Sequence, residues 1–315
     1  MKKSNLFKVL IFIPLLTYAQ EDSSMSSLLD KYHQIISYWV IDGSDSIDRY
    51  LSGTKDKKRL SKTKINLSYE IGTYNTGGLV NNFDFGISLS LPRFKNKAKI
   101  TLEKVNRDKS LFGNNREAVL SKKDDDTSLD SYNLALKYSQ WGGKKSKIGL
   151  TGGIRFNKLI VEPYLGVIAG YSIKSNNKEN INLKNILRFY LAGEIKDSLS
   201  AQYLYNYSSD LLLGWRGNID YSNKSDEQTF ISEFICHKYV NEYKFFRFGF
   251  ISTASLTNFK HFRKGDFEIY SKIHNKMMDK KWLYYEVTPS LDWKRKDNYK
   301  TSVGIKFKIG ASFGG

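Results

Sequence analysis

The stretch Trp282–Trp293, WLYYEVTPSLDW, decides the fold of this chain together with residues 300–313, KTSVGIKFKIGASF. In both stretches apolar and polar residues alternate. Side chains along a strand point to opposite faces with period two, so each stretch predicts a strand with one apolar face and one charged or small face. Residues 294–299 supply a turn between them. Such a hairpin needs a nonpolar medium on one side and a polar medium on the other.

The length of these strands separates a membrane barrel from a soluble sandwich, which would also offer two environments. Tyr285 and Trp293 share the apolar face. At about 3.3 Å per residue and a tilt near 40°, they are separated by roughly 20 Å along a barrel axis, which approaches the apolar band of an outer-membrane barrel. Strands of roughly ten residues also exceed the usual five or six of soluble domains. We therefore expect the closing hairpin of a transmembrane barrel.

The first 19 residues have the layout of a secretory signal. Lys2, Lys3 and Lys8 precede the apolar run VLIFIPLL, and Ala19 supplies a small residue before a cleavage site. A membrane anchor is the weaker interpretation, because the run is shorter than the roughly 20 residues that span a bilayer. We predict a signal peptide over residues 1–19 and a mature chain that begins at Gln20.

Residues 20–63 depart from the strand pattern. Apolar residues recur at spacings of three and four over residues 26–42, which predicts an amphipathic helix. Gly43 is the expected stop, and residues 46–51 are expected to form a second helical turn. Because Trp39 suits a membrane interface, we expect a periplasmic or interfacial helix and linker rather than a plug inside the barrel.

Residues 64–313 alternate in nearly every segment, which predicts one barrel domain. We count about fourteen candidate strands, or twelve if two weak runs merge, and single-chain bacterial barrels have an even number. Residues 107–127 lose the pattern and are expected to form the longest surface loop. Residues 201–207 and 211–221 predict either a hairpin or one very long strand, and residues 230–239 are the least regular.

Together these features resemble the Gram-negative outer-membrane β-barrel class. Besides the leader and the alternating strands, the chain contains many aromatic residues, namely 21 tyrosines, 19 phenylalanines and five tryptophans. The resemblance implies an all-β transmembrane antiparallel up-and-down barrel of 12–14 strands with a short N-terminal amphipathic helix, in the cell outer membrane. It also implies contact with outer-membrane lipid and lipopolysaccharide, and insertion by the barrel-assembly machinery. Members commonly end on an aromatic residue, whereas here Phe313 is followed by Gly314 and Gly315.

The charge of the chain suggests what the interior could do. The formal net charge is +18, or +15 without the three lysines of the leader. Basic residues exceed acidic ones on the polar face of the predicted strands, and a basic pore lowers the barrier for anions. We therefore expect a porin-like passive channel for small solutes, with anions favoured. The basic residues expected to face the lumen are Arg155, Arg188, Arg216, Arg247, Lys306 and Lys308.

A closed structural or adhesion barrel is the alternative, in which these charges pair with one another and fill the interior. Lysines in the loops would then hold the anionic surface of lipopolysaccharide or the lipid headgroups. The high basic charge would also suit a nucleic-acid partner. The predicted export and the barrel pattern argue against such a partner. The oligomeric state is not determined by these patterns.

An enzyme would need a catalytic constellation, and outer-membrane phospholipases and proteases place a histidine with serine or aspartate at the outer rim. None of His33, His237, His261 and His274 has a local serine, carboxylate or asparagine at a spacing that indicates a triad. We therefore expect no enzyme, with an outer-membrane hydrolase as the least favoured function.

Metal and cofactor sites are not expected either. The run Asp124–Asp126 lacks the spacing of a defined calcium loop. The single cysteine, Cys236, excludes an internal disulfide and a multi-cysteine metal site. We predict no metal and no cofactor.

Overall fold

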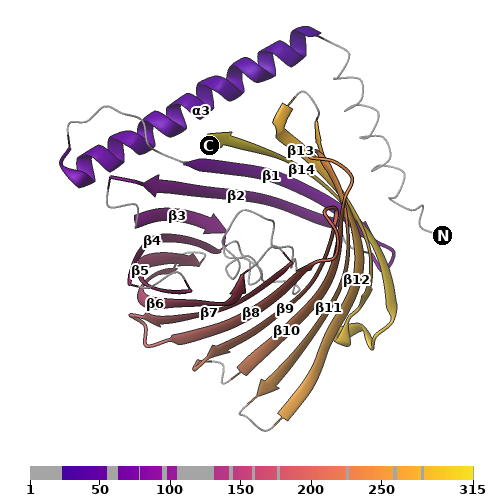
Figure 1. Cartoon of the computed structure of the whole chain (residues 1–315). Helices are drawn as coiled ribbons and strands as arrows, with labels where there is room; N and C mark the ends of the chain where they lie inside the picture. Colours follow the sequence, from indigo (N-terminus) through magenta and orange to yellow (C-terminus); the bar gives the residue numbers. More distant parts are fainter. Residues whose placement is uncertain are drawn as a thin grey trace.

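The described residues form a closed ring of fourteen strands with one long helix at one end of the ring (Figure 1). The structure is a computed structural model of all 315 residues. It describes residues 23–54, 63–77, 79–93, 98–104, 131–141, 145–157, 160–175, 178–224, 227–257, 261–277 and 280–314. The predicted signal peptide over residues 1–19 and the predicted loop over residues 107–127 lie outside these ranges.

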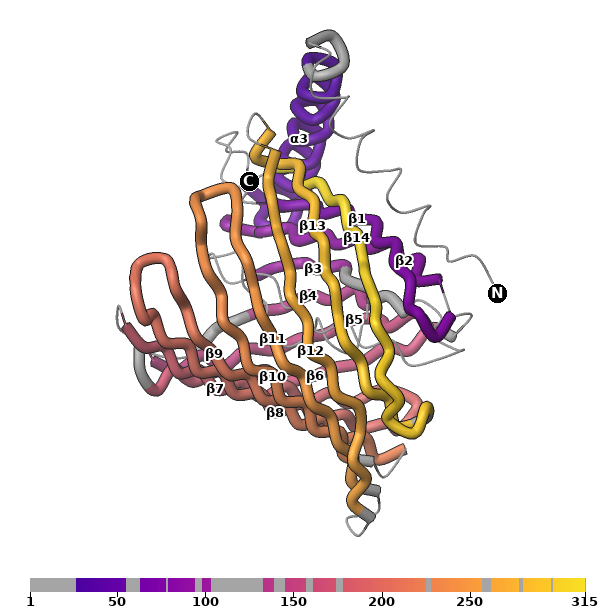
Figure 2. Tube along the Cα trace, turned by 90° about the vertical axis from the view of Figure 1, so that its right-hand side faces the viewer, coloured from indigo at the N-terminus to yellow at the C-terminus, as the bar shows by residue number. Residues whose placement is uncertain are grey.

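Every strand pairs antiparallel with its neighbours in chain order, and β14 closes onto β1 from Lys64↔Gly314 to Tyr74↔Gly304. The strands are β1 (Lys64–Tyr74), β2 (Leu79–Leu91), β3 (Ala98–Lys104), β4 (Ser131–Trp141), β5 (Ser146–Asn157), β6 (Ile160–Ser175), β7 (Glu179–Tyr190), β8 (Ile195–Asn206), β9 (Leu211–Ser222), β10 (Glu227–Tyr239), β11 (Lys244–Thr257), β12 (His261–Met277), β13 (Lys280–Trp293) and β14 (Thr301–Gly314). Figure 2 shows β9 to β14 running side by side along one wall. The predicted up-and-down barrel and its closing hairpin, β13–β14, are confirmed, and the strand number is the larger of the two expected.

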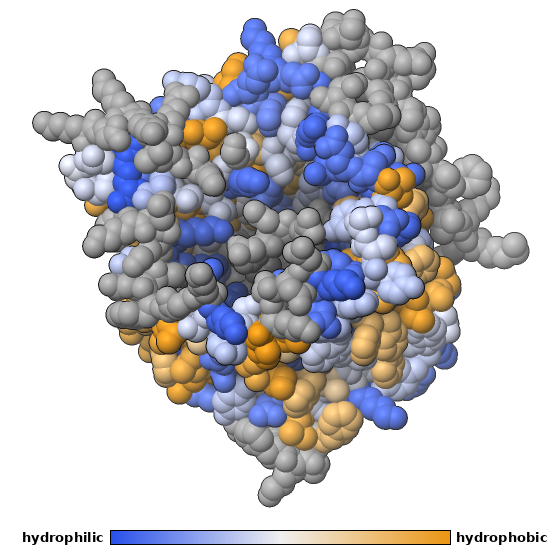
Figure 3. Space-filling view, viewed as in Figure 1, coloured by the Kyte–Doolittle hydropathy of each residue, from blue (hydrophilic) through white to orange (hydrophobic). Residues whose placement is uncertain are grey.

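The alternation of each strand becomes two faces of the wall. On β14, Ser302 and Lys306 are buried while Val303 between them is exposed. Large apolar side chains such as Leu213 and Phe248 are exposed on the opposite face from the charges. Figure 3 shows apolar residues gathered along the lower outer edge of the molecule. The apolar face is therefore the outer face of the ring, and the polar face lines its interior.

Two ambiguous runs are settled by the pairing. Residues 201–207 and 211–221 belong to the hairpin β8–β9. Residues 230–239, which have the least regular alternation of the predicted strands, form part of β10, and β10 pairs along its length with both neighbours. Its alternation is hard to recognise because Ile231 points inward, where it packs against Ile251 and Tyr270.

The helix α3 (Ser23–Ser52) is continuous, so the expected stop at Gly43 is wrong. A glycine inside a helix costs about 1 kcal/mol relative to alanine, which local contacts can outweigh. Here Asp45 and Asp48, just beyond Gly43, form ion pairs with Arg93 after β2. These contacts hold the second half of the helix in place. No helix in the described ranges has an apolar stretch long enough to cross a membrane.

Candidate functional site

The interior wall of the barrel is the candidate functional site, because it gathers charged side chains that are nearly inaccessible to solvent. Glu233 on β10 is 0% exposed, and Arg247 on β11 and Glu286 on β13 are both 3% exposed. Buried charges are stable only when they are paired or hydrogen-bonded. Each charge of the inner wall therefore needs a partner to be stable there.

One group of charges lies on β9, β10 and β12. The carboxylate of Glu233 accepts a hydrogen bond of 2.6 Å from the Tyr270 hydroxyl and lies 3.6 Å from Nη1 of Arg216. Because Arg216 and Glu233 are directly opposite in the β9–β10 register, the pairing of the strands aligns them. This triad ties three strands together within the lumen.

A second group surrounds Glu286 on β13. The Lys272 ammonium donates to one carboxylate oxygen at 2.9 Å, and Nδ1 of His274 lies 3.0 Å from the other. On the neighbouring strands the Phe245 ring stacks against His274 at 4.5 Å and against His237 at 4.3 Å between centroids. Nε of Arg247 donates to Nδ1 of His237 at 3.3 Å. The wall from β10 to β13 thus combines charges with flat aromatic spacers.

The two predicted lysines of β14 lie farther along the same wall. Nζ of Lys306 is 3.9 Å from Glu268 on β12, and Nζ of Lys308 is 3.7 Å from Asp84 on β2. Lys308 therefore bridges the closure of the barrel, since its partner lies on the other side of β1. These pairs are longer than direct hydrogen bonds.

The remaining predicted residues, Arg155 and Arg188, meet at a pair of tyrosines on the opposite wall. The rings of Tyr164 on β6 and Tyr190 on β7 are tilted, with centroids 5.3 Å apart. The Arg155 guanidinium lies 4.2 Å from the centre of the Tyr190 ring, and that of Arg188 lies 5.7 Å from the centre of the Tyr164 ring. Both distances fall within the range of cation–π contacts.

These two arginines differ in their acidic partners. Arg155 donates from Nε to Glu162 at 2.6 Å and from Nη2 to Glu194 at 2.7 Å. Burial raises the pKa of Glu194, but hydrogen bonds from Arg155 and Ser222 and the charge of Lys196 outweigh it and lower the pKa. Arg188, by contrast, has no acidic partner among the described residues. In the register of β7 and β8 it lies directly opposite another basic residue, Lys196.

Three buried polar atoms on β5, β6 and β7 make no hydrogen bond to any described residue. They are Nε of Arg188, the Tyr164 hydroxyl and Oγ1 of Thr151. The register brings them together, because Gly166 pairs with both Thr151 and Arg188, and Tyr164 pairs with Gly153 between β5 and β6. Buried polar atoms are usually satisfied, so this cluster has unused hydrogen-bonding capacity.

The six predicted basic residues thus lie on the inner face in four groups rather than as one ring. Sequence reasoning missed the aromatic residues Tyr164, Tyr190 and Phe245, which share the inner face with the charges. Each of these aromatic residues falls on the polar parity of its strand, and this parity is the sequence feature that predicts an inward position. The pairing of the charges could not be read from the sequence, because partners such as Glu233 and Tyr270 are 37 residues apart.

The ring of strands has no free edge, and its outer face carries exposed apolar residues. A closed barrel satisfies every backbone pair internally, which is the condition for strands to cross a lipid bilayer. The chain is therefore a closed β-barrel of the kind that spans membranes. No family model matches the chain, and no curated protein matches it.

Several solved structures resemble the chain at low sequence identity. OmpT folded in vitro, an outer membrane protein of Vibrio cholerae, is 8% identical with a TM-score of 0.49 over 82% of this chain and 100% of that chain. The CymD monoaromatic hydrocarbon channel is 8% identical with a TM-score of 0.46 over 87% and 92%. The NanC porin is 11% identical with a TM-score of 0.38 over 78% and 98%.

The four histidines considered for catalysis lie on the inner wall (His237 and His274), on α3 (His33) and at the first residue of β12 (His261). His237 and His274 lie in the inner wall beside Arg247 and Glu286, whereas His33 lies on α3 and contacts the carbonyl oxygen of Ser312 at 3.0 Å. The expectation that the chain is no enzyme stays a prediction. No group of three or more potential metal ligands comes together among the described residues.

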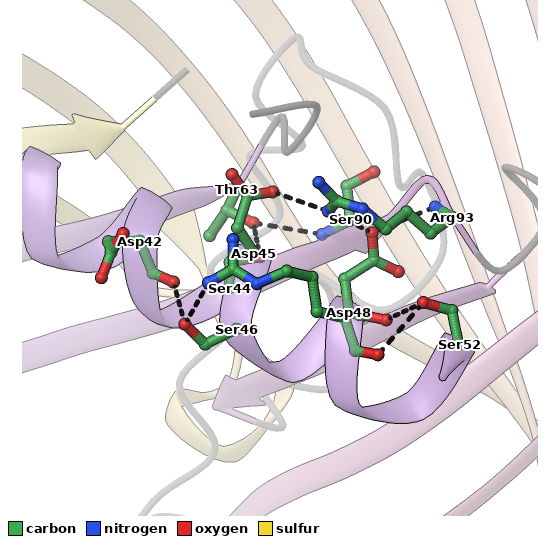
Figure 4. A network of polar contacts seen from close by, with 10 residues as sticks. Asp42, Ser44, Asp45, Ser46, Asp48, Ser52, Thr63, Ser90 and Arg93 are labelled. Atoms are coloured by element: carbon green, nitrogen blue, oxygen red, sulfur yellow. Dashed lines mark hydrogen bonds and ion pairs between the residues drawn. The ribbon is translucent and has the colours of Figure 1, made fainter. Parts of the chain in front are cut away.

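A polar network joins α3 to the end of the barrel (Figure 4). Nη1 of Arg93 lies 3.3 Å from Asp45 and 3.2 Å from Asp48, and both carboxylates are fully buried. The Arg93 amide also donates to Asp48 at 3.0 Å. One turn earlier, the Ser44 hydroxyl contacts that of Thr63 at 2.5 Å, just before β1. The second half of α3 is thereby fixed to β1 and β2.

Proposed function

We propose that the barrel is a channel for small solutes and that it favours anions. The supporting observation is Arg188, a basic side chain of the inner wall that lacks an acidic partner among the described residues. The acids Glu162, Glu194, Glu233 and Glu286 already lie beside basic groups. The excess positive charge would therefore act on a solute rather than on the wall.

The strand number is compatible with a passage. Eight-stranded barrels are filled by their own side chains, whereas barrels of 16–18 strands leave an aqueous channel. Fourteen strands lie between these limits. Buried groups such as Glu233 and Tyr270 narrow one side of the interior, and the cluster around Arg188 lies on the other side. A passage between them would be restricted and basic.

Conductance in a planar bilayer tests the proposal. In a salt gradient the refolded mature protein should give a reversal potential that favours chloride. A unit charge 5 Å from an anion in water contributes about 0.8 kcal/mol, or about fourfold in local anion concentration. Arg188→Gln should therefore move the reversal potential toward zero. Lys281→Gln is the matched control, because Lys281 is 67% exposed at the end of β13 and carries the same charge.

A closed structural barrel is the second candidate function. The observation that favours it is the near-complete burial of the inner wall between β9 and β13, where Tyr270 is 2% exposed. Protein that is folded by heat-modifiable gel mobility but gives no conductance would overturn the channel and favour this alternative. Equal ion preference in wild type and Arg188→Gln would overturn the role of Arg188 alone.

A further inference from the structure

The helix α3 contacts the barrel with its polar face. Asp30 accepts a hydrogen bond of 2.5 Å from Lys280, and the Ser37 hydroxyl accepts one of 3.0 Å from the Gly314 amide. The hydrogen bond from Lys280 lowers the pKa of Asp30. Asp45 and Asp48 complete this face through Arg93. Residues 30, 37, 45 and 48 recur at helical spacing, so they form one stripe.

The opposite stripe of α3 is apolar and uncovered. Leu28 is 50% exposed, Tyr32 62%, Trp39 68% and Tyr50 87%. Leu28, Tyr32 and Trp39 follow one another at spacings of four and seven residues, which places them on one side of the helix. A helix that packs on a soluble surface normally buries this side. Here the polar side is buried and the apolar side is presented outward.

The position of the helix indicates what covers this stripe. Figures 1 and 2 both place α3 beside β1 and the C-terminus, outside the ring of strands. Its His33 ring lies 5.3 Å from Phe313, which belongs to the outward-facing apolar parity of β14. His33 also stacks on Trp282 at 4.3 Å. The helix thus begins where the lipid-facing wall of the barrel ends.

We propose that α3 is an interfacial helix whose apolar stripe, Leu28, Tyr32, Ile35, Trp39 and Tyr50, lies in the lipid surface around the barrel rim. Tyrosine and tryptophan are enriched at membrane interfaces, where the ring meets acyl chains and the polar atom stays hydrated. The buried area and the aromatic residues drive this contact rather than charge, because the acids of the opposite stripe are engaged with the barrel: Asp30 pairs with Lys280, and Asp45 and Asp48 share Arg93. The ion pairs with Arg93 set the depth of the helix relative to the strands.

Fluorescence of a probe on the stripe tests this proposal in the full mature chain. Cys236 is the single cysteine, so Cys236→Ser permits labelling of Trp39→Cys with an environment-sensitive dye after reconstitution into phospholipid vesicles. Interfacial helices sit about 5–10 Å into the headgroup and acyl boundary. The dye should therefore emit at shorter wavelength than in water, and a spin label near the lipid headgroups should quench it more strongly than one at the bilayer centre.

Gln34→Cys is the matched control, because Gln34 is exposed but lies on another side of the same helix. Its dye should emit as in water and resist both lipid quenchers. Water-like emission at position 39 would overturn the proposal. Short-wavelength emission without lipid quenching, or self-quenching that rises with protein density, would overturn it in favour of a protein or a second copy of the chain.

Discussion

Replacing Glu286 with glutamine measures whether the inner wall is dry. Glu286 and its partner Lys272 are 3% and 5% exposed, and Nδ1 of His274 contacts the same carboxylate. Glu286→Gln keeps the shape of the side chain but leaves the Lys272 charge without its counterion. Removing one member of a buried ion pair costs about 3–5 kcal/mol, whereas a solvated pair contributes about 0–1 kcal/mol.

Urea unfolding in detergent micelles, followed by tryptophan fluorescence, can resolve this difference. With an m value of about 1–3 kcal/mol per molar urea, a loss of about 3 kcal/mol lowers the midpoint by about 1–3 M. Glu242→Gln is the control, because Glu242 and Lys281 are 66% and 67% exposed and 3.7 Å apart. That variant should unfold at the wild-type midpoint.

An unchanged midpoint for Glu286→Gln would refute the reasoning, because water would then screen the pair. Such a wet lumen would in turn favour an open passage over a closed barrel. A large loss would indicate a dry wall between β11 and β13 and restrict any passage to the side of Arg188. The measurement therefore bears on both candidate functions without depending on either.

Three further perturbations follow from the geometry. Gly43→Ala should slow amide exchange across α3 about fivefold, because alanine favours the helix by about 1 kcal/mol. A Cβ at Gly43 meets no atom within 4 Å, so the substitution causes no overlap. Unchanged exchange would mean that tertiary contacts alone hold the helix. Gly249→Ala should lower the free energy of unfolding by about 1–3 kcal/mol, because the new Cβ would overlap the Tyr270 ring, and Tyr270→Ala should relieve part of that loss in a double variant. Hydrogen bonds from Lys238 and Ser208 lower the pKa of Asp210 from 3.8 to about 2, so its contribution to stability is present above pH 3.8 and lost as the pH falls through about 2. A carboxyl titration by NMR that finds an ordinary value for Asp210 would contradict the last prediction, and Asp210→Asn should abolish the dependence.

Much of the fold could be predicted because it depends on local alternation. The period of two in residues 282–313 identifies the strands, the lipid-facing side and the closing hairpin, and the structure confirms each of them. The stop at Gly43 was predicted wrongly because a local preference of about 1 kcal/mol is weaker than the contacts of Asp45 and Asp48. The alternation of β10 is less regular because Ile231 is an apolar residue on the inner face.

The sequence by itself determined which side chains share a face, because the backbone of a strand sets their direction. It placed Arg155, Arg188, Arg216, Arg247, Lys306 and Lys308 together on the polar parity. Only the tertiary structure decided which of them are neutralised. The register across neighbouring strands gives Arg216 its carboxylate on β10 and leaves Arg188 beside Lys196. The orientation of α3 was decided in the same way, because a helix with one polar and one apolar stripe can present either to the barrel until ion pairs such as Asp48–Arg93 select one.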